Sequence, residues 1–337
     1  MSIIFCGDTV LPFDTTVDYS EIKHLFSGKI AIANLEGSII KDRNKLRENK
    51  WNDKYSLYSC LKILNVLKDL NIKFVSLCNN HILDYKIPIQ ETEELLRKND
   101  IEYFGLKNHD VLCTRLNGKP LYIITFSTCV NGHALNLYNP DKIINDIKEI
   151  KEREDCYIVL FPHWGIERLP YVEPADREHA HRCIDAGADL IIGHHPHIIQ
   201  QVERYKEKTI VYSIGNFIFP QTYYGDKKLI FDNPAIQKEL IVEWDGENVS
   251  FYMLYYDAIE NIIKYIENTD KNLTVIPVEI TNKSYKEFFK AKTSKKTYYI
   301  SRRRKDSFRS EFFCFLRKCI FRYIRRMLII IRIHTPK

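Results

Sequence analysis

The feature that most constrains this chain is the segment from Gly193 to His197, which reads Gly-His-His-Pro-His and holds three of the chain's eleven histidines. It directly follows Asp189–Ile192, a mostly apolar run that is typical of a short buried strand. Neutral imidazole binds zinc, iron and manganese. Residues i and i+2 of an extended segment point to the same side. We therefore expect His195 and His197 to share one face at the carboxyl end of a strand, where open α/β sheets place their ligands.

Strand-like and helix-like segments alternate through the first half of the chain, and the second half is richer in antiparallel strand patterns. This order favours a mixed α/β sandwich over a purely parallel sheet. A polar stretch over residues 41–55 is expected to be a long loop that covers a site. The predicted strands are 3–5, 30–33, 73–77, 101–104, 111–116, 121–126, 157–161, 189–192, 198–202, 209–212, 239–244 and 249–256, and the predicted helices are 19–26, 57–70, 89–98, 141–153 and 174–186.

The net charge of +6 is unevenly distributed, because residues 301–337 alone carry a balance of +10 and the remaining residues about −4. We expect a main domain over residues 1–282 and a basic, partly amphipathic tail over 283–337. The apolar run Met327–Ile331 is too short to span a bilayer. The tail composition fits a helix on an anionic membrane surface, a helix that docks on a partner, or, least well, a nucleic-acid patch.

The chain contains nine scattered cysteines without a Cys-x-x-Cys pair, which favours buried, reduced thiols in a reducing compartment. Met1 and Ser2 run straight into a strand-like segment, without the basic and apolar regions of a signal peptide. We therefore expect a cytoplasmic protein, with the tail as a means of peripheral attachment to the inner face of the membrane.

Polar groups follow several of the predicted strands. Taken singly, Asp8 would suit a turn, Glu36 a solvated loop or a helix cap, and His163 a hydrogen-bonded core histidine. Together these segments supply carboxylates, an amide oxygen and imidazoles, the mixed ligand set of a two-metal site. The segments are Cys6–Thr9, Asn34–Gly37, Asn79–His81 with Asp84, His163–Glu167, Gly193–His197 and Ser213–Phe217.

In their order and spacing these motifs resemble the CapA family of capsule and poly-γ-glutamate synthesis, which is itself similar to the calcineurin-like metallophosphoesterases. The resemblance covers about residues 3–219 and implies a two-sheet αββα sandwich of the metallophosphoesterase type. It also implies one or two divalent ions, with manganese, iron or zinc as the candidates. Asp8, Glu36 and His197 would hold one metal, and Asn80, His163 and His195 the other, with Glu36 as the bridge.

The resemblance further implies that His81 and Glu167 serve the chemistry, with His81 near the scissile group as a general acid or electrostatic donor. His194 matches no fixed ligand position. Val10 stands where metallophosphoesterases have a histidine, so one metal would be held by fewer imidazoles. The residues expected to contact substrate or to orient the ligands are Asn34, Asn79, Asp84 and Asn216.

Two functions remain open. The first is a metal-dependent hydrolase that acts on a phosphoester or amide of a capsule or exopolymer precursor through a metal-activated water. The second is a non-catalytic accessory protein that binds the polymer, or docks on a synthesis complex through its tail. A nucleic-acid partner has no support outside the tail and is disfavoured.

Overall fold

The computed structural model describes residues 1–48, 56–107, 109–129, 138–224, 227–229, 231, 233–268 and 273–293. The described core belongs to a compact unit, Met1–Phe289. The amphipathic stretch predicted near the carboxyl end lies outside the described residues, as does the second half of the loop predicted over 41–55. Within the described ranges, no helix combines the length and apolar character needed to cross a membrane.

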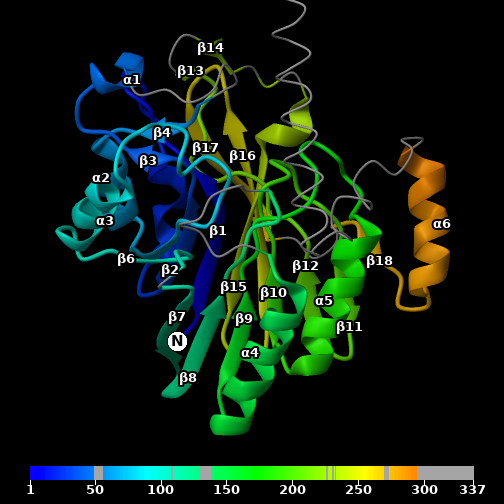
Figure 1. The fold of residues 1–337 in the computed structure, drawn as a ribbon. Helices are drawn as coiled ribbons and strands as arrows, with labels where there is room; N and C mark the ends of the chain where they lie inside the picture. Colours follow the sequence, from blue (N-terminus) through cyan, green and yellow to red (C-terminus); the bar gives the residue numbers. More distant parts are fainter. Residues whose placement is uncertain are drawn as a thin grey trace, which may run out of the picture. The chain divides into compact units, whose positions relative to one another are not determined.

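Two seven-stranded sheets form the centre of this unit (Figure 1). Strands β1, β2, β5 and β6 of the first sheet run parallel, and β15, β16 and β17 add to it in antiparallel fashion. Strands β8, β9, β10 and β12 form the parallel part of the second sheet. In spatial order, the first sheet consists of β17 (Ile262–Asn268), β16 (Val249–Asp257), β15 (Lys238–Trp244), β1 (Ile3–Thr9), β2 (Ile30–Leu35), β5 (Ile72–Ser76) and β6 (Glu102–Phe104). The second consists of β18 (Val275–Ile276), β11 (Val202–Tyr205), β12 (Lys208–Val211), β10 (Leu190–Ile192), β9 (Tyr157–Leu160), β8 (Lys119–Ile124) and β7 (Val111–Leu116).

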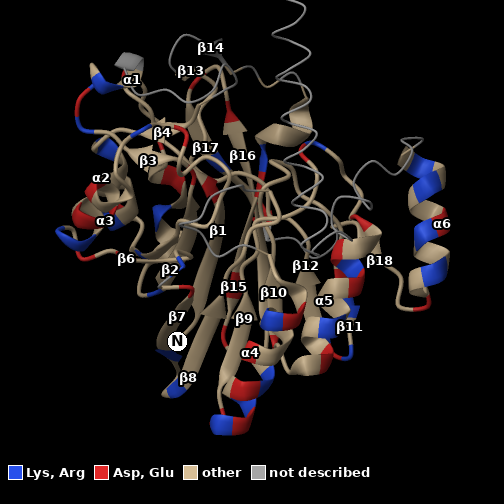
Figure 2. Ribbon diagram, in the orientation of Figure 1, with Lys and Arg blue, Asp and Glu red and all other residues tan. Residues whose placement is uncertain are grey.

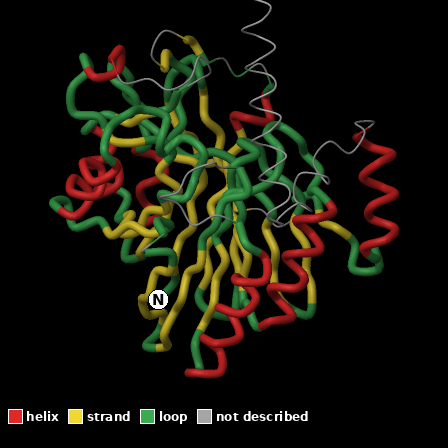
Figure 3. Tube along the Cα trace, in the orientation of Figure 1, coloured by secondary structure: helices red, strands yellow, loops and turns green. Residues whose placement is uncertain are grey.

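The two sheets pack face to face, and helices cover the outer face of each (Figure 3). Apolar side chains such as Phe5, Ile32, Phe161 and Val211 fill the space between the sheets. Lys, Arg, Asp and Glu lie mainly on the outer helices and loops, while the strands are largely uncharged (Figure 2). The expected αββα sandwich is therefore confirmed. The covering helices are η1 (Ser20–Phe26), α2 (Lys62–Asp69) and α3 (Ile89–Arg97) on the first sheet, and α4 (Pro140–Arg153) and α5 (Pro174–Ala186) on the second.

Short elements complete the fold. Strands β3 (Ser38–Ile39) and β4 (Tyr58–Ser59) pair with each other, as do β13 (Tyr223–Tyr224) and β14 (Lys227–Lys228). Helix α6 (Asn282–Thr293) was not predicted, yet its Tyr285 and Phe289 pack into the apolar cluster beneath α4 and α5. The remaining helical turns are α1 (Lys45–Glu48), which lies in the predicted loop, and η2 (Pro234–Gln237).

The helix predicted over residues 57–70 starts later than expected, at Lys62. Residues Tyr58 and Ser59 instead form strand β4 beside β3. The Leu57 amide donates to Asp84 Oδ2 at 2.9 Å, and the Cys60 amide donates to the Leu11 carbonyl oxygen at 2.7 Å. These tertiary hydrogen bonds hold the segment extended despite its helix-like apolar spacing.

The strand predicted over residues 198–202 is also wrong, because β11 begins only at Val202. Ser213 Oγ donates to the Ile198 carbonyl oxygen at 2.8 Å, and the Gln200 amide donates to the Ser213 carbonyl oxygen at 3.0 Å. The segment after the histidine cluster therefore binds to the loop after β12 instead of joining the sheet at once.

Candidate metal centre

The carboxyl edge of the second sheet brings two histidines together. Beyond the carboxyl ends of β8, β9 and β10, the three neighbouring segments continue to pair: Ser127 is bridged to His163, and His163 to His194. The His163 amide donates to the Phe126 carbonyl oxygen at 2.9 Å, which holds His163 beside the residues that follow β8. As a result the Nδ1 atoms of His163 and His194 lie 2.8 Å apart. The carboxyl ends of neighbouring parallel strands meet at one edge, which explains this juxtaposition.

The edge of the first sheet holds Asp8 in a fixed orientation. Asp8 pairs with Asn34 in the parallel β1–β2 ladder, and Asn34 Nδ2 donates to Asp8 Oδ1 at 2.8 Å. Asn79 Nδ2 in turn donates to Asn34 Oδ1 at 3.1 Å. A Cβ atom on Gly7 would lie 2.0 Å from the Gly215 carbonyl oxygen, so only glycine permits this backbone approach. The predicted residues Asn34 and Asn79 therefore form a chain of amides that orients Asp8.

Glu36 lies just beyond β2 and is completely buried. Among the residues that the structure describes, neither of its carboxylate oxygens has a hydrogen-bond partner. Its Oε1 lies 3.9 Å from His163 Nε2, and the same Nε2 lies 2.6 Å from Asn80 Oδ1. The Nδ1 atom of the buried His195 also has no partner within the described part of the chain. Buried polar atoms without partners are rare, and these lie beside other side chains that can bind a metal.

His195 and His197 converge on the site through a turn, which differs from the extended geometry expected from their spacing. Both have left-handed backbones, with φ of 105° and 57°. Such angles are uncommon for non-glycine residues and carry a cost that the surrounding contacts must offset. The His195 amide donates to Asp8 Oδ2 at 3.1 Å, and His197 Nδ1 lies 3.3 Å from the same oxygen and 2.9 Å from Asn216 Oδ1. These contacts with Asp8 and Asn216 hold the turn in place.

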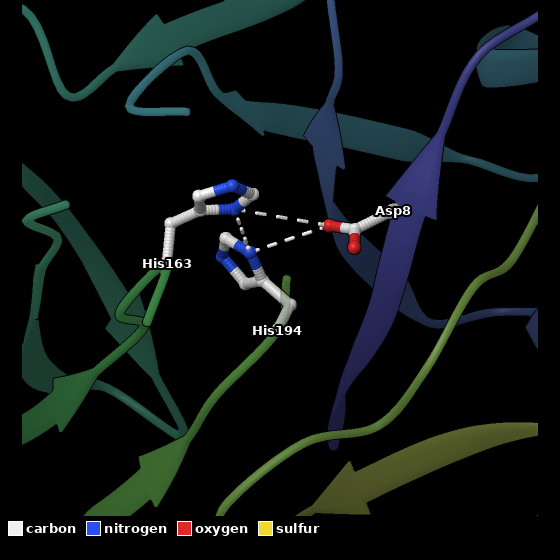
Figure 4. Close-up of side chains that lie close together, drawn as sticks. All are labelled: Asp8, His163 and His194. Carbon is white, nitrogen blue, oxygen red and sulfur yellow. Dashed lines mark hydrogen bonds and ion pairs between the residues drawn. The ribbon is translucent and has the colours of Figure 1, made fainter. Parts of the chain in front are cut away.

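Five of the predicted metal residues, together with His194, fall into overlapping groups that could hold a cation. In each group one ligand atom per residue lies within 4.8 Å of the others. Figure 4 shows one of them, in which Asp8 faces His163 and His194 across the two sheet edges. The groups are Asp8 with His163 and His194, Glu36 with His163 and His195, and Asp8 with Glu36 and His197.

The two residues predicted to serve the chemistry lie at the rim of this cluster. His81 Nδ1 lies 2.6 Å from Asp84 Oδ2, which also accepts the hydrogen bond from the Leu57 amide. Glu167 is exposed, and its carboxylate is close enough to affect the pKa of Glu36. The neighbouring Arg168 amide donates to the Pro196 carbonyl oxygen at 2.8 Å, which ties the Glu167 loop to the histidine turn.

Burial and mutual proximity shift the pKa values of the cluster away from their ordinary values. Burial raises the pKa of Glu36 well above its usual range, and the nearby Asp8 and Glu167 carboxylates raise it further. Burial also lowers the pKa of His163 well below its usual range, and the adjacent histidines add to this effect. The imidazole is therefore neutral, which is the form that binds metals. A cation would offset the repulsion between the buried carboxylates.

Comparison with known proteins agrees with the motifs. The family described as "Bacterial capsule synthesis protein PGA_cap" matches residues 3–221, more than half of the chain. The chain belongs to this family. Capsule biosynthesis protein CapA of Bacillus anthracis is 29% identical over 194 residues, which are 52% of this chain and 46% of that protein. PGA biosynthesis protein CapA of Bacillus subtilis is 28% identical over 204 residues, 56% of this chain and 52% of that protein.

This PGA_cap chain thus spans about half the length of the curated relatives it matches. Its structure is also similar to that of a phosphatase from Mycoplasma pneumoniae, with a TM-score of 0.45 and 12% sequence identity. That comparison covers 80% of this chain and 92% of the other.

One member of the cluster, His194, was not predicted from the family motif. It is fully buried, and its Nδ1 lies 3.3 Å from Asp8 Oδ1. The signal that could have found it is register: His194 follows β10 as His163 follows β9, and the two strands are parallel neighbours. That pairing depends on strand order, which a single sequence does not specify.

Proposed function

We propose that this PGA_cap protein is a metal-dependent hydrolase in the synthesis of a bacterial capsule or exopolymer. The observation that carries the proposal is Glu36, a wholly buried carboxylate with neither oxygen hydrogen bonded within the described structure, beside two histidines. An isolated buried carboxylate is strongly destabilising unless it is protonated or paired with a cation. A divalent cation would provide the pairing that this cluster lacks.

The donor set fits such an ion. Glu36, His163, His195 and the amide oxygen of Asn80 offer the oxygen and nitrogen ligands that manganese, iron and zinc accept. Asp8 and His197 would hold a second ion together with Glu36. A bound divalent cation would lower the pKa of a water and stabilise negative charge that develops on a phosphoester or amide. The ligand chemistry leaves the identity of the metal open among the three.

The residues at the rim supply the remaining functions. Asp84 accepts a hydrogen bond from His81 Nδ1 and thereby fixes the ring, so that the other ring nitrogen can donate a proton to a leaving group. Glu167 would orient a polar group of the substrate from the opposite loop. Asn216 bonds to His197 and would steady that ligand against the incoming substrate.

The metal is tested first. The purified protein is expected to contain manganese, iron or zinc in stoichiometric amount by elemental analysis, and His195→Ala with His197→Ala should remove most of it. The matched control is His179→Ala with His181→Ala, a pair of buried histidines on α5 outside the cluster. Equal metal content in both double variants would refute the proposal.

Hydrolysis is tested with generic probes, because the natural substrate is unidentified. Bis-p-nitrophenyl phosphate represents a phosphodiester and a glutamyl p-nitroanilide represents an amide. We expect turnover of one of them to depend on added Mn²⁺ or Zn²⁺ and to fall at least about 100-fold in His81→Ala. Turnover that is equal in the presence of a chelator would contradict the proposed chemistry.

A second candidate, favoured by the +10 balance of residues 301–337, is an accessory protein that docks on a synthesis complex or on an anionic membrane surface through this segment. Loss of capsule on deletion of residues 312–337, with normal capsule for Glu36→Ala and His163→Ala, would support it. The reverse pattern would support the hydrolase.

A further inference from the structure

The two ring nitrogens of His163 lie in different surroundings. On one side, Nε2 lies 2.6 Å from Asn80 Oδ1 and 3.9 Å from Glu36 Oε1. On the other side, Nδ1 lies 2.8 Å from His194 Nδ1 and 4.0 Å from Asp8 Oδ1. A neutral imidazole offers one lone pair and one N–H, so it can present only one of these nitrogens to a cation.

The pairing of the surrounding groups shows which side is open to a cation. On the Nδ1 side, the facing oxygen, Asp8 Oδ1, already accepts a hydrogen bond from Asn34 Nδ2 at 2.8 Å. Among the described residues, four atoms of the cluster have no hydrogen-bond partner. Glu36 Oε1, Glu36 Oε2 and His195 Nδ1 belong to the group on the Nε2 side, and the fourth, His194 Nε2, is not the ring nitrogen that faces His163. The Nε2 atom of His163 therefore faces the cation position, and Nδ1 belongs to the hydrogen-bond network behind it.

We propose that His194 is a positioning residue that holds His163 for cation binding. With a cation at Nε2, the N–H of His163 is on Nδ1, and its acceptor at 2.8 Å is His194 Nδ1. In metal sites, such a partner fixes both the tautomer and the orientation of the ligating ring. This role rests on the proposed metal centre, and it gives His194 a function that differs from that of a direct ligand.

His194 is well built for this role. It has no solvent exposure, and its ring lies against Phe161, with the ring centroids 4.4 Å apart. Its amide donates to the Pro162 carbonyl oxygen at 3.0 Å, and its carbonyl oxygen accepts from the Trp164 amide at 3.1 Å. These hydrogen bonds from the backbone on both sides of His163 thus hold His194 directly beside His163 at the edge of the sheet. The ring has little freedom to turn away from His163.

The test is cation affinity, measured by calorimetric titration of the chelator-stripped full chain with Mn²⁺ and, separately, Zn²⁺. His194→Leu removes the acceptor, and we expect its affinity for the tightest ion to fall about 10- to 100-fold with unchanged stoichiometry. His194→Asn keeps a polar group near the Nδ1 position and should remain within a few-fold of the wild type. His194→Gln places its amide farther out, near the Nε2 position, and should behave like His194→Leu.

A matched control is His179→Leu, which removes another buried histidine of the second-sheet side, one that contacts Cys183 Sγ. It should leave the affinity unchanged, which separates the effect of His194 from general loosening. Thermal unfolding in chelator checks that each variant is folded. If His194→Leu does not fold, the comparison of His194→Asn with His194→Gln still tests the proposal. Equal affinity of the Asn and Gln variants, or the loss of one ion from the stoichiometry, would overturn the positioning role. A wild-type protein that binds neither ion would instead refute a manganese or zinc centre.

Discussion

Two buried glutamates of this molecule, Glu36 and Glu203, differ in whether their carboxylate oxygens are hydrogen bonded. Glu36 is completely buried and Glu203 is 2% exposed. Both oxygens of Glu203 are hydrogen bonded, to Arg177 Nη2 at 2.5 Å and to the Tyr212 hydroxyl at 2.7 Å. Within the described structure, neither oxygen of Glu36 is bonded. Burial of a charge therefore does not by itself mark a functional site; a buried carboxylate without partners beside metal-binding side chains does.

The Glu203 cluster is a structural connection. Arg177 of α5 also donates to Asn282 Oδ1 and to the Ile280 carbonyl oxygen, both at 2.7 Å. These bonds join α5 and β11 to the segment that leads into α6. Every donor nitrogen of Arg177 is used, so both charged groups of the Arg177–Glu203 pair are hydrogen bonded within the described structure. Glu203 therefore contributes to the stability of the fold, whereas Glu36 is the carboxylate that we propose binds a cation.

The largest expected effect is on the structural side of this comparison. Glu203→Ala leaves the Arg177 guanidinium buried without its counter-charge, so the free energy of unfolding should fall by about 3–5 kcal/mol. Urea denaturation followed by circular dichroism measures it. Metal content per folded molecule should stay at the wild-type value. A loss of less than about 1 kcal/mol would mean that solvent compensates the guanidinium and that the cluster is not a structural connection.

Glu36→Gln should have the opposite effect. In chelator at pH 7, the variant should be more stable than the wild type by about 1–3 kcal/mol, because it removes a buried charge without a partner. Added Mn²⁺ should raise the unfolding temperature of the wild type and leave the variant unchanged. A variant that is less stable in chelator would show that the Glu36 carboxylate is bonded after all.

The pH dependence gives a second check on Glu36. Its pKa in the folded protein lies well above the ordinary value of 4.5 that applies to the unfolded chain. The unfolded chain therefore releases this proton first, and the wild type loses stability as the pH rises from about 4.5 toward the folded pKa. The advantage of Glu36→Gln in chelator should thus vanish near pH 4 and grow toward neutral pH. An advantage that is constant across this range would contradict the assignment.

Local signals made much of the fold predictable. The hairpin β7–β8 turns at Asn117-Gly118, as the sequence indicates, and α5 ends at Gly187, whose φ is 119°. Strand-end positions likewise indicated Asp8 and Glu36 as parts of one site. These elements depend on short-range chemistry, so a single sequence is enough to find them.

Features that depend on long-range register could not be predicted. The pairing of His194 with His163 requires knowledge that β10 lies beside β9. The extended segment before α2 depends on the bond between the Leu57 amide and Asp84. Helix α6 has a polar composition, and the burial of Tyr285 and Phe289 identifies its inner face. In each case the deciding partner is distant in the sequence.

A third buried glutamate, Glu239, sharpens the comparison. It is 1% exposed, its Oε2 has no partner among the described residues, and burial raises its pKa well above the ordinary value. Unlike Glu36, it belongs to none of the candidate cation groups found in the described chain. Glu239→Gln should therefore stabilise the protein by about 1 kcal/mol at pH 7, with or without Mn²⁺. A stabilisation that appears only in chelator would place Glu239 in the cation site.

The smallest expected effect concerns the edge of the structural cluster. The Tyr285 hydroxyl lies 2.8 Å from Gln201 Oε1 and 3.0 Å from the Val172 carbonyl oxygen. Tyr285→Phe keeps the buried ring and removes only the hydroxyl, so unfolding in urea should become easier by about 0.5–1 kcal/mol. Metal affinity should not change, because the bonds that orient His163 and Asp8 are untouched. If Mn²⁺ binding weakens as well, the two polar regions are coupled, and the division between a cluster for stability and a cluster for binding would fail.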